Sequence, residues 1–327
     1  MNIVYTFDEG FVEITGVSLT SVLENNKDVS EINVYVVDCG ISTQGKQIIT
    51  DIVKEYKRNV FFYKAINLDE RIPTKIECLC WSSVCYQRLF FAEILPKSLN
   101  KVIHIDCDTI VRRNLKEIYS YNIKEYFGAA CYDCTPKPKR QAFLPEDTPY
   151  FSNGIIVVNL EKWRNENISN KFVDYIVSKD GKLAHLDQDV INAVLYNKIK
   201  RLPAEYNLMP ITLMYKELCC SLFNDKEYYY TKSEIEFAVK NPAVIHFTGC
   251  MYTRRPWDQP CNHWFNDEWI KYYNKTKYSK SKQLLQSKKR KFIAIKQIYS
   301  KSWLIGCKIA IIKRILFWLD RKFLYHI

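Results

Sequence analysis

The sequence has no run of 18 uncharged apolar residues, so a membrane-spanning helix is not expected. Lys308, Lys313 and Arg314 interrupt its most hydrophobic stretch. The N-terminal MNIVYTFDEG has neither the basic nor the apolar region of a secretory signal peptide. No internal repeat or low-complexity linker precedes the C-terminal region. We therefore expect a cytoplasmic protein without a membrane span.

A second cysteine pair at zinc-ribbon spacing is also missing. The one C-x-x-C, Cys131 to Cys134, stands alone, so a structural zinc site is not expected. The 12 cysteines are scattered through apolar stretches of a chain of 327 residues, which is far too long to need a disulfide scaffold. We expect buried thiols in a reducing compartment.

Acidic residues are almost absent from the C-terminal region. Residues 271–327 contain 16 Lys and Arg and a single acid, Asp320, whereas the rest of the chain has a net charge of −3. Trp303, Trp318 and many Ile and Leu alternate with the basic residues, which suits a helix lying on an anionic membrane surface. A solvated basic extension is the alternative. No recognition motif accompanies the charge, so nucleic acid is not an expected partner.

The remaining sequence alternates strand patterns with helical ones, which predicts an α/β fold with a mostly parallel sheet. Strands are expected at 2–7, 32–38, 59–63, 101–106, 127–132 and 155–160. Helices are expected at 17–25, 42–57, 82–95, 161–178 and 188–197. We assign residues 1–265 to one domain and residues 266–327 to a basic, aromatic-rich helical tail that associates with the membrane.

Two aspartates directly follow the predicted strand at 101–106. Ligands gather at the carboxyl ends of strands in open α/β sheets, and Asp106 and Asp108 lie at such an end. Mg²⁺ and Mn²⁺ prefer oxygen ligands and keep positions open for phosphate oxygens. The apolar run 244–247 delivers one polar side chain, His246, which is either a core histidine or a third ligand.

Ordered motifs between residue 1 and about residue 264 resemble family 8 of the retaining glycosyltransferases, which includes bacterial lipopolysaccharide galactosyl- and glucosyltransferases. The motifs are IVYTFD at 3–8, YQRL at 86–89, HIDCD at 104–108, YFSNG at 150–154, VNLEKWR at 158–164, LDQDVIN at 186–192, YNLMP at 206–210, HFTG at 246–249 and RPW at 255–257. The chain departs from the family where many members read Phe-Asn-Ala/Ser-Gly, because its amide is displaced by one residue to Asn153. The segment between Gly249 and Pro256 is also about three residues longer than in short-loop members.

This resemblance implies a GT-A fold, a single Rossmann-like domain with a mixed sheet and flanking helices. It implies Mn²⁺, or Mg²⁺, bound by Asp106, Asp108 and His246 and bridging the diphosphate of a UDP-sugar donor. The other nucleotide contacts that it implies are Thr6, Asp8, Gly10, Arg88, Gly249 and Arg255. The donor-sugar contacts are Arg88, Ser152, Asn153, Asp187 and Gln188, with Gln188 and Asp187 as the catalytic pair, and Asp133 faces the acceptor.

The implied activity is transfer of a hexose, galactose or glucose, from a UDP-sugar to an oligosaccharide or glycolipid acceptor in lipopolysaccharide, capsule or another surface glycan. The enzyme would act on the inner face of the cell membrane, with retention of anomeric configuration. Each residue also has a structural alternative: Arg88 could lie on the surface and Asp187 could cap a helix. Two other functions compete, a haloacid dehalogenase-type phosphatase with Asp106 as nucleophile and a non-enzymatic membrane- or RNA-binding module.

Overall fold

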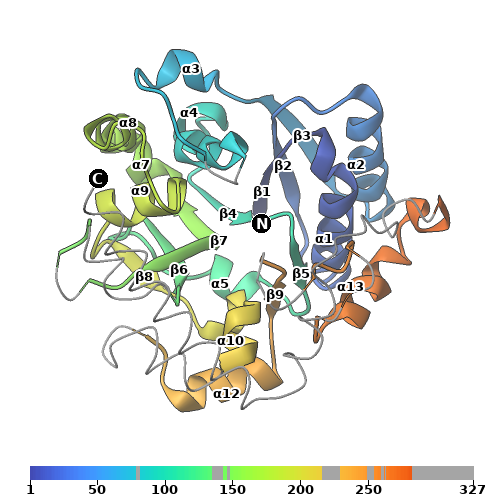
Figure 1. The fold of residues 1–327 in the computed structure, drawn as a ribbon. Helices are drawn as coiled ribbons and strands as arrows, with labels where there is room; N and C mark the ends of the chain where they lie inside the picture. Colours follow the sequence, from blue (N-terminus) through green and yellow to red (C-terminus); the bar gives the residue numbers. More distant parts are fainter. Residues whose placement is uncertain are drawn as a thin grey trace, which may run out of the picture.

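A seven-stranded mixed sheet forms the centre of the protein (Figure 1). The computed structural model describes residues 1–78, 82–134, 143–145, 148–215, 229–248, 254–258, 261 and 263–281. The strand order is β3-β2-β1-β4-β7-β6-β8. The strands are β1 (Asn2–Phe7), β2 (Asn33–Asp38), β3 (Asn59–Lys64), β4 (Lys101–Ile105), β6 (Gly128–Tyr132), β7 (Phe151–Asn159) and β8 (Ile199–Arg201).

Strand β7 is the one that reverses direction in this sheet, among the strands that the structure describes. It pairs antiparallel with β4 and with β6, whereas β1, β2, β3 and β4 pair in parallel and β6 is parallel to β8. A second, two-stranded antiparallel sheet is formed by β5 (Thr109–Val111) and β9 (Val244–His246). The predicted mixed, mostly parallel sheet is therefore confirmed.

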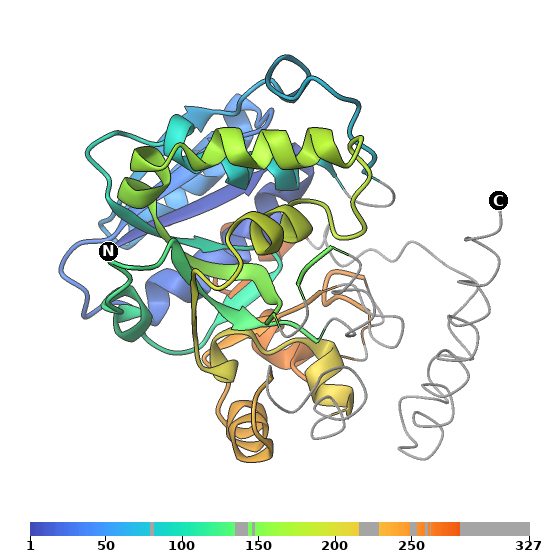
Figure 2. The same ribbon diagram turned by 90° about the vertical axis from the view of Figure 1, so that its left-hand side faces the viewer.

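Helices cover both faces of the sheet, because side chains along each strand alternate between the two faces. Ile3 and Tyr5 of β1 belong to one core with α1 (Val12–Glu24) and α2 (Thr43–Glu55). Val4 belongs to the opposite core. That second core contains residues of η2 (Ser83–Phe90), α4 (Phe91–Ile94), α7 (Leu160–Asn165), α8 (Ile168–Ser178) and α9 (Asp187–Val194). Figure 2 shows α8 lying along its side of the sheet.

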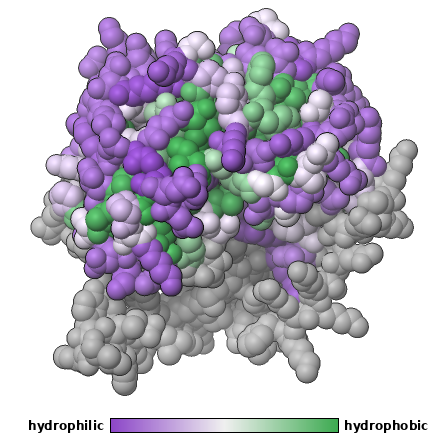
Figure 3. Space-filling model, turned by 90° about the horizontal axis from the view of Figure 1, so that it is seen from above, coloured by the Kyte–Doolittle hydropathy of each residue, from purple (hydrophilic) through white to green (hydrophobic). Residues whose placement is uncertain are grey.

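Shorter elements complete the described chain. They are η1 (Glu9–Phe11), α3 (Leu68–Arg71), α5 (Lys116–Tyr119), η3 (Ala204–Asn207), α10 (Pro210–Tyr215), α12 (Lys232–Lys240), α13 (Asn266–Tyr273) and η4 (Lys277–Ser281). Strand β3 forms one edge of the main sheet and leaves Phe61 42% exposed, with its ring stacked on Tyr35. Apart from the grey atoms, the face in Figure 3 is largely hydrophilic, with separate hydrophobic patches.

Several predicted elements have different bounds in the structure. The helix predicted at 17–25 begins at Val12, and the helix predicted at 82–95 is the 3-10 helix η2 followed by α4. The single helix predicted at 161–178 is two helices, α7 and α8, because Asn167 adopts a left-handed conformation with φ of 50° between them. Asparagine tolerates this conformation better than most residues. The strand predicted at 155–160 begins at Phe151, so the polar Ser152 and Asn153 belong to β7 itself.

The first residues after position 265 pack on the domain. Trp269, Tyr272 and Tyr273 of α13 are almost fully buried and contact a cluster that includes Val17 of α1. The hydroxyl of Tyr278 donates to the backbone oxygen of Glu13 at 2.7 Å. Large aromatic side chains therefore bind the described start of the predicted tail to α1. The rest of the predicted tail, 282–327, lies outside the described residues, and no helix within the described ranges is long and apolar enough to cross a membrane.

Candidate active site

Backbone pairing brings the predicted cation ligands together from distant parts of the sequence. Asp106 directly follows β4, and Asp108 directly precedes β5. Strand β5 pairs with β9 so that Thr109 lies opposite His246. The backbone N–H of Phe247 donates to the backbone oxygen of Asp108 at 2.7 Å. This pairing fixes the histidine beside the second aspartate.

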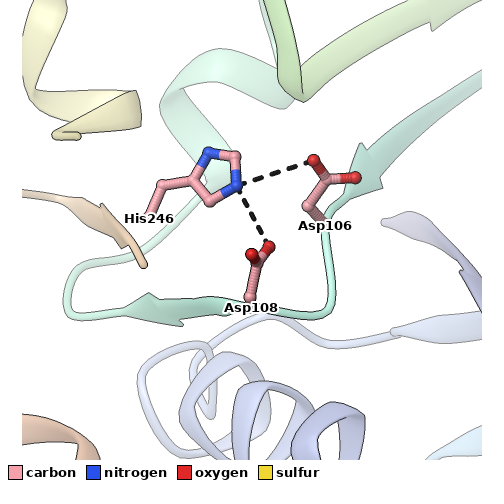
Figure 4. Close-up of side chains that lie close together, drawn as sticks. All are labelled: Asp106, Asp108 and His246. Carbon is pink, nitrogen blue, oxygen red and sulfur yellow. Dashed lines mark hydrogen bonds and ion pairs between the residues drawn. The ribbon is translucent and has the colours of Figure 1, made fainter. Parts of the chain in front are cut away.

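The three side chains point toward one another (Figure 4). One ligand atom from each of Asp106, Asp108 and His246 lies within 4.8 Å of the other two. The His246 Nε2 atom is 3.0 Å from Asp108 Oδ1 and 3.6 Å from Asp106 Oδ2. Two carboxylates and one imidazole nitrogen form a suitable ligand set for Mn²⁺ and leave coordination positions for phosphate oxygens. The predicted convergence of these residues is confirmed.

Opposite charges and burial shift the pKa values of this group. Burial raises the pKa of Asp106. Burial opposes ionisation of Asp108 as well, but His246 and Arg255 bring the pKa of this carboxyl well below its usual range. Burial disfavours the charged form of His246, yet the Asp108 carboxylate raises its pKa above the ordinary value. The site therefore favours positive charge, whether from protons or from a cation.

Arg88 connects the cation ligands to the predicted donor-sugar residues. Its guanidinium is 2.9 Å from Asp106 Oδ1 and 3.0 Å from Asp187 Oδ2, and it donates to the backbone oxygen of Asn153 at 2.9 Å. Arg88 is only 9% exposed, so it is not a surface residue of η2. A buried guanidinium held by two carboxylates has a fixed position.

The donor-sugar residues form a second hydrogen-bonded group, at the start of β7 and of α9. The Asn153 amide donates to Asp187 Oδ2 at 3.0 Å, and its backbone N–H donates to Gln188 Oε1 at 3.1 Å. The Gln188 amide donates to Asp133 Oδ2 at 3.3 Å. The Asn153 Oδ1 atom is buried and has no hydrogen-bond partner among the described residues. A buried, unpaired acceptor of this kind suits a sugar hydroxyl.

The predicted nucleotide contacts lie at the same edge of the sheet. Strand β1 is the parallel neighbour of β4, so Thr6 and Asp8 at its carboxyl end lie beside the residues that follow β4. The Thr6 hydroxyl is buried and has no partner in the described part of the chain. A Cβ atom added to Gly10 would lie 3.3 Å from Asp8 Oδ1. These positions fit a nucleotide that extends from β1 toward Asp106.

Arg255 reaches the site from the C-terminal part of the domain. Its guanidinium is 3.2 Å from Asp108 Oδ2 and lies over the ring of Trp257. The structure thus places this arginine beside Asp108, one of the predicted cation ligands. Gly249, the other residue predicted near the phosphates, lies outside the described residues.

Sequence reasoning missed two residues that support the ligands. Asn207 lies 2.9 Å from His246 Nδ1, and Ser152 accepts a hydrogen bond from the Asn207 amide at 2.9 Å. The backbone oxygen of Gly154 accepts a hydrogen bond from the backbone N–H of Asp106 at 2.8 Å. A Cβ atom added to Gly154 would lie 2.3 Å from the His246 ring. Both residues belong to motifs noted in the sequence, YNLMP and YFSNG, but the motifs alone did not reveal what they contact.

The fold is of the GT-A type. The solved structure of galactosyltransferase LgtC in complex with donor and acceptor sugar analogues has the same fold. It superposes with a TM-score of 0.72 at 20% sequence identity, over 85% of this chain and 96% of that one.

The sequence gives the family directly. Residues 2–261 match the model of glycosyl transferase family 8, and the chain belongs to this family. General stress protein A of Bacillus subtilis (strain 168) is 26% identical over 85% of this chain and 95% of its own length. Lipopolysaccharide 1,2-glucosyltransferase of Escherichia coli (strain K12) is 26% identical over 84% of this chain and 76% of its own length. The predicted family is confirmed, and it favours the transferase over the phosphatase and the non-enzymatic module.

Proposed function

We propose that the protein is a retaining hexosyltransferase that uses a UDP-sugar and Mn²⁺, or Mg²⁺, and transfers galactose or glucose to a lipopolysaccharide or another surface glycan. The convergence of Asp106, Asp108 and His246 at the carboxyl edge of the sheet is the observation that carries the proposal. Family membership supports the glycosyl transfer. The E. coli relative, a lipopolysaccharide 1,2-glucosyltransferase, supports glucose and lipopolysaccharide.

The ligand set fits a divalent cation that is bound together with a diphosphate. Asp106, Asp108 and His246 would hold the cation, which would supply positive charge to the diphosphate as it leaves the sugar. Arg255 stands beside Asp108 and can pair with the same phosphates. Thr6 and Asp8 are placed to contact the nucleoside, because they follow the neighbouring strand.

The environment of Asp187 and Gln188 supports attack from the front face of the donor sugar. Retention through a covalent intermediate requires a carboxylate nucleophile on the far face. The Asp187 carboxylate is already held by Arg88 and Asn153, and the next residue, Gln188, is an amide. An amide is a poor nucleophile, but its dipole can stabilise the positive charge that develops on the sugar. The leaving phosphate would then accept the proton of the acceptor hydroxyl.

Asp133 is the proposed contact with the acceptor. It follows β6 and accepts a hydrogen bond from Gln188, so it lies next to the residue proposed to face the reacting carbon. A carboxylate at this point can orient a hydroxyl of an oligosaccharide or glycolipid acceptor.

A panel of UDP-sugars tests the function most directly. The protein is incubated with UDP-galactose, UDP-glucose and their N-acetylated relatives, with Mn²⁺ and then with Mg²⁺, and released UDP and inorganic phosphate are measured separately. We expect metal-dependent release of UDP from one or two donors, and no release after chelation. Release of inorganic phosphate from a hexose phosphate assayed in parallel, with no UDP released from any donor, would instead support the phosphatase.

We also propose that residues 282–327 bind an anionic membrane surface and place the enzyme on the inner face of the cell membrane. The support is compositional, a dense set of basic residues alternating with Trp, Ile and Leu. The packing of Tyr278 on α1 places the suitable truncation after Ser281. We expect the truncated protein to lose binding to vesicles that contain anionic lipid while it still hydrolyses the donor. Vesicle sedimentation measures this, and equal binding by both proteins would refute the tail's role.

A further inference from the structure

Asn207 contacts the nitrogen of His246 that faces away from the two aspartates. The His246 ring turns Nε2 toward Asp108 and Asp106, and its Nδ1 lies 2.9 Å from Asn207 Oδ1. Asn207 and His246 are each 4% exposed. The contact is thus a buried one, on the opposite side of the ring from the proposed cation.

The second hydrogen bond of Asn207 decides which of its atoms faces the ring. The amide nitrogen donates to the Ser152 hydroxyl at 2.9 Å, so the amide oxygen is the atom left for His246. An amide oxygen can only accept, and the Nδ1 of His246 must therefore carry a proton. The Nε2 of a neutral imidazole then has the lone pair and is the nitrogen that can bind a cation.

The backbone holds Asn207 and His246 in a fixed relation. Leu208, the next residue after Asn207, forms an isolated bridge with Ile245 of β9. The backbone N–H of Leu208 donates to the backbone oxygen of Val244 at 2.9 Å. The backbone oxygen of Leu208 accepts a hydrogen bond from the backbone N–H of His246 at 3.0 Å. The two side chains thus extend from paired backbone segments, and this pairing fixes the relative position of the two backbones.

Gly154 completes the support from β7. A side chain here would collide with the His246 ring, since its Cβ would lie 2.3 Å from the Nδ1 and Cε1 atoms. The ring therefore lies directly over the glycine backbone, between Asn207 on one side and the aspartates on the other. Ser152, two residues earlier on the same strand, holds the amide of Asn207.

We propose that Asn207 is a positioning residue that fixes the tautomer and the orientation of His246 for cation binding. This inference rests on the proposed metal-dependent function. A hydrogen bond from the distal nitrogen of a ligating histidine to an oxygen acceptor orients the ring and makes the ligand nitrogen more basic, and loss of such a partner typically weakens metal binding about 10- to 100-fold. Asn207 would act through His246 and would not touch the substrate.

The test measures Mn²⁺ binding to the full-length protein without donor, by titration calorimetry and by the electron paramagnetic resonance signal of free Mn²⁺. Asn207→Ala should raise the Kd for Mn²⁺ about 10- to 100-fold. Asn207→Asp keeps an oxygen acceptor for the same N–H and should bind Mn²⁺ at least as tightly as the wild type. Saturating Mn²⁺ should restore much of the kcat of the alanine variant, because only the ligand's position is impaired.

Asn159→Ala is the matched control. Asn159 is also a buried asparagine, but it lies at the far end of β7 and caps α7 through Lys162. Its loss should lower the melting temperature and leave the Kd for Mn²⁺ unchanged. If Asn207→Ala does not fold, Ser152→Ala releases the same amide and should weaken Mn²⁺ binding by about threefold, the effect of one neutral hydrogen bond.

Several outcomes would overturn the inference while leaving the metal site intact. One such outcome is that Asn207→Ala binds Mn²⁺ as tightly as the wild type. If Asn207→Ala does not fold, the corresponding outcome is wild-type Mn²⁺ affinity in Ser152→Ala. Another is equal weakening in Asn207→Asp and Asn207→Ala, which would indicate a general packing defect. Failure of the wild type itself to bind Mn²⁺, or binding that Asp108→Ala does not reduce, would instead contradict the proposed function.

Discussion

The two halves of the site are held in different ways. In the cation group, Asp106, Asp108 and His246 bring two carboxylates close to one another, with a ring nitrogen between them. In the donor-sugar group, Asn153 and Gln188 hydrogen-bond within the group and hold their neighbours. We propose that a bound cation completes the first group, whereas hydrogen bonds already join the members of the second. Substitutions in the first should therefore abolish activity, and those in the second should reduce it by degrees.

The largest effect is expected from Asp108→Ala. This change removes a cation ligand and the partner of both His246 and Arg255. Because the cation is proposed to supply several kcal/mol of stabilisation, kcat/KM should fall by about a thousandfold or more. Steady-state UDP release at several Mn²⁺ concentrations measures it. Activity within tenfold of the wild type would show that the cation is held elsewhere.

Arg88→Met should damage both groups at once. The change leaves the buried Asp187 and the partly exposed Asp106 without their shared partner, and breaking a buried pair such as Arg88–Asp187 costs about 3–5 kcal/mol of stability. Denaturant unfolding followed by circular dichroism measures the loss. Arg88→Lys keeps the charge but cannot reach both carboxylates in the same geometry, so an intermediate loss is expected. Wild-type stability in the methionine variant would contradict the bridging role.

Gln188→Ala should lower kcat and leave a measurable rate. An amide that stabilises the developing charge by its dipole contributes about 2.7–4 kcal/mol at most, or roughly 100- to 1000-fold. The KM for the donor should change much less, because the effect belongs to the transition state. Asp108→Ala is the comparison, assayed beside it. A loss as complete as in Asp108→Ala would point to a covalent step in this region.

The smallest effect is expected from Asn153→Ala. The side chain is lost, but the backbone N–H that holds Gln188 remains. Asp187 loses the Asn153 amide and keeps Arg88. The loss of a hydrogen bond to a charged group predicts a decrease in kcat/KM of roughly tenfold or somewhat more. Ser152→Ala is compared with it in donor hydrolysis at saturating Mn²⁺. A larger loss of kcat/KM in Ser152→Ala than in Asn153→Ala would indicate that Ser152, and not Asn153, contacts the sugar.

Most of the fold could be predicted from the sequence, and so could the candidate cation ligands. The alternation of strand and helix patterns predicted the sheet, and Asp106 and Asp108 stood at the end of an apolar strand. Asn167 shows the limit of such patterns, because its left-handed conformation splits a helix that hydrophobic spacing alone predicts as continuous.

The partners of the ligands were not predictable in the same way. Asn207 and His246 are 39 residues apart and meet only because Leu208 pairs with β9. The packing of Trp269 on α1 was not predictable for a related reason, since it depends on a contact between segments that are far apart in the sequence. Contacts that join distant segments need the three-dimensional arrangement.

The position of Arg88 has a consequence for how the cation and the donor affect each other's binding. Its guanidinium is shared between Asp106 on the cation side and Asp187 on the sugar side. A cation that takes up Asp106 frees part of this arginine for the negative donor, and a donor that draws the arginine toward itself leaves Asp106 more available to the cation. Such coupling is reciprocal by thermodynamic necessity. The cation and the nucleotide sugar should consequently bind cooperatively, each tightening the other.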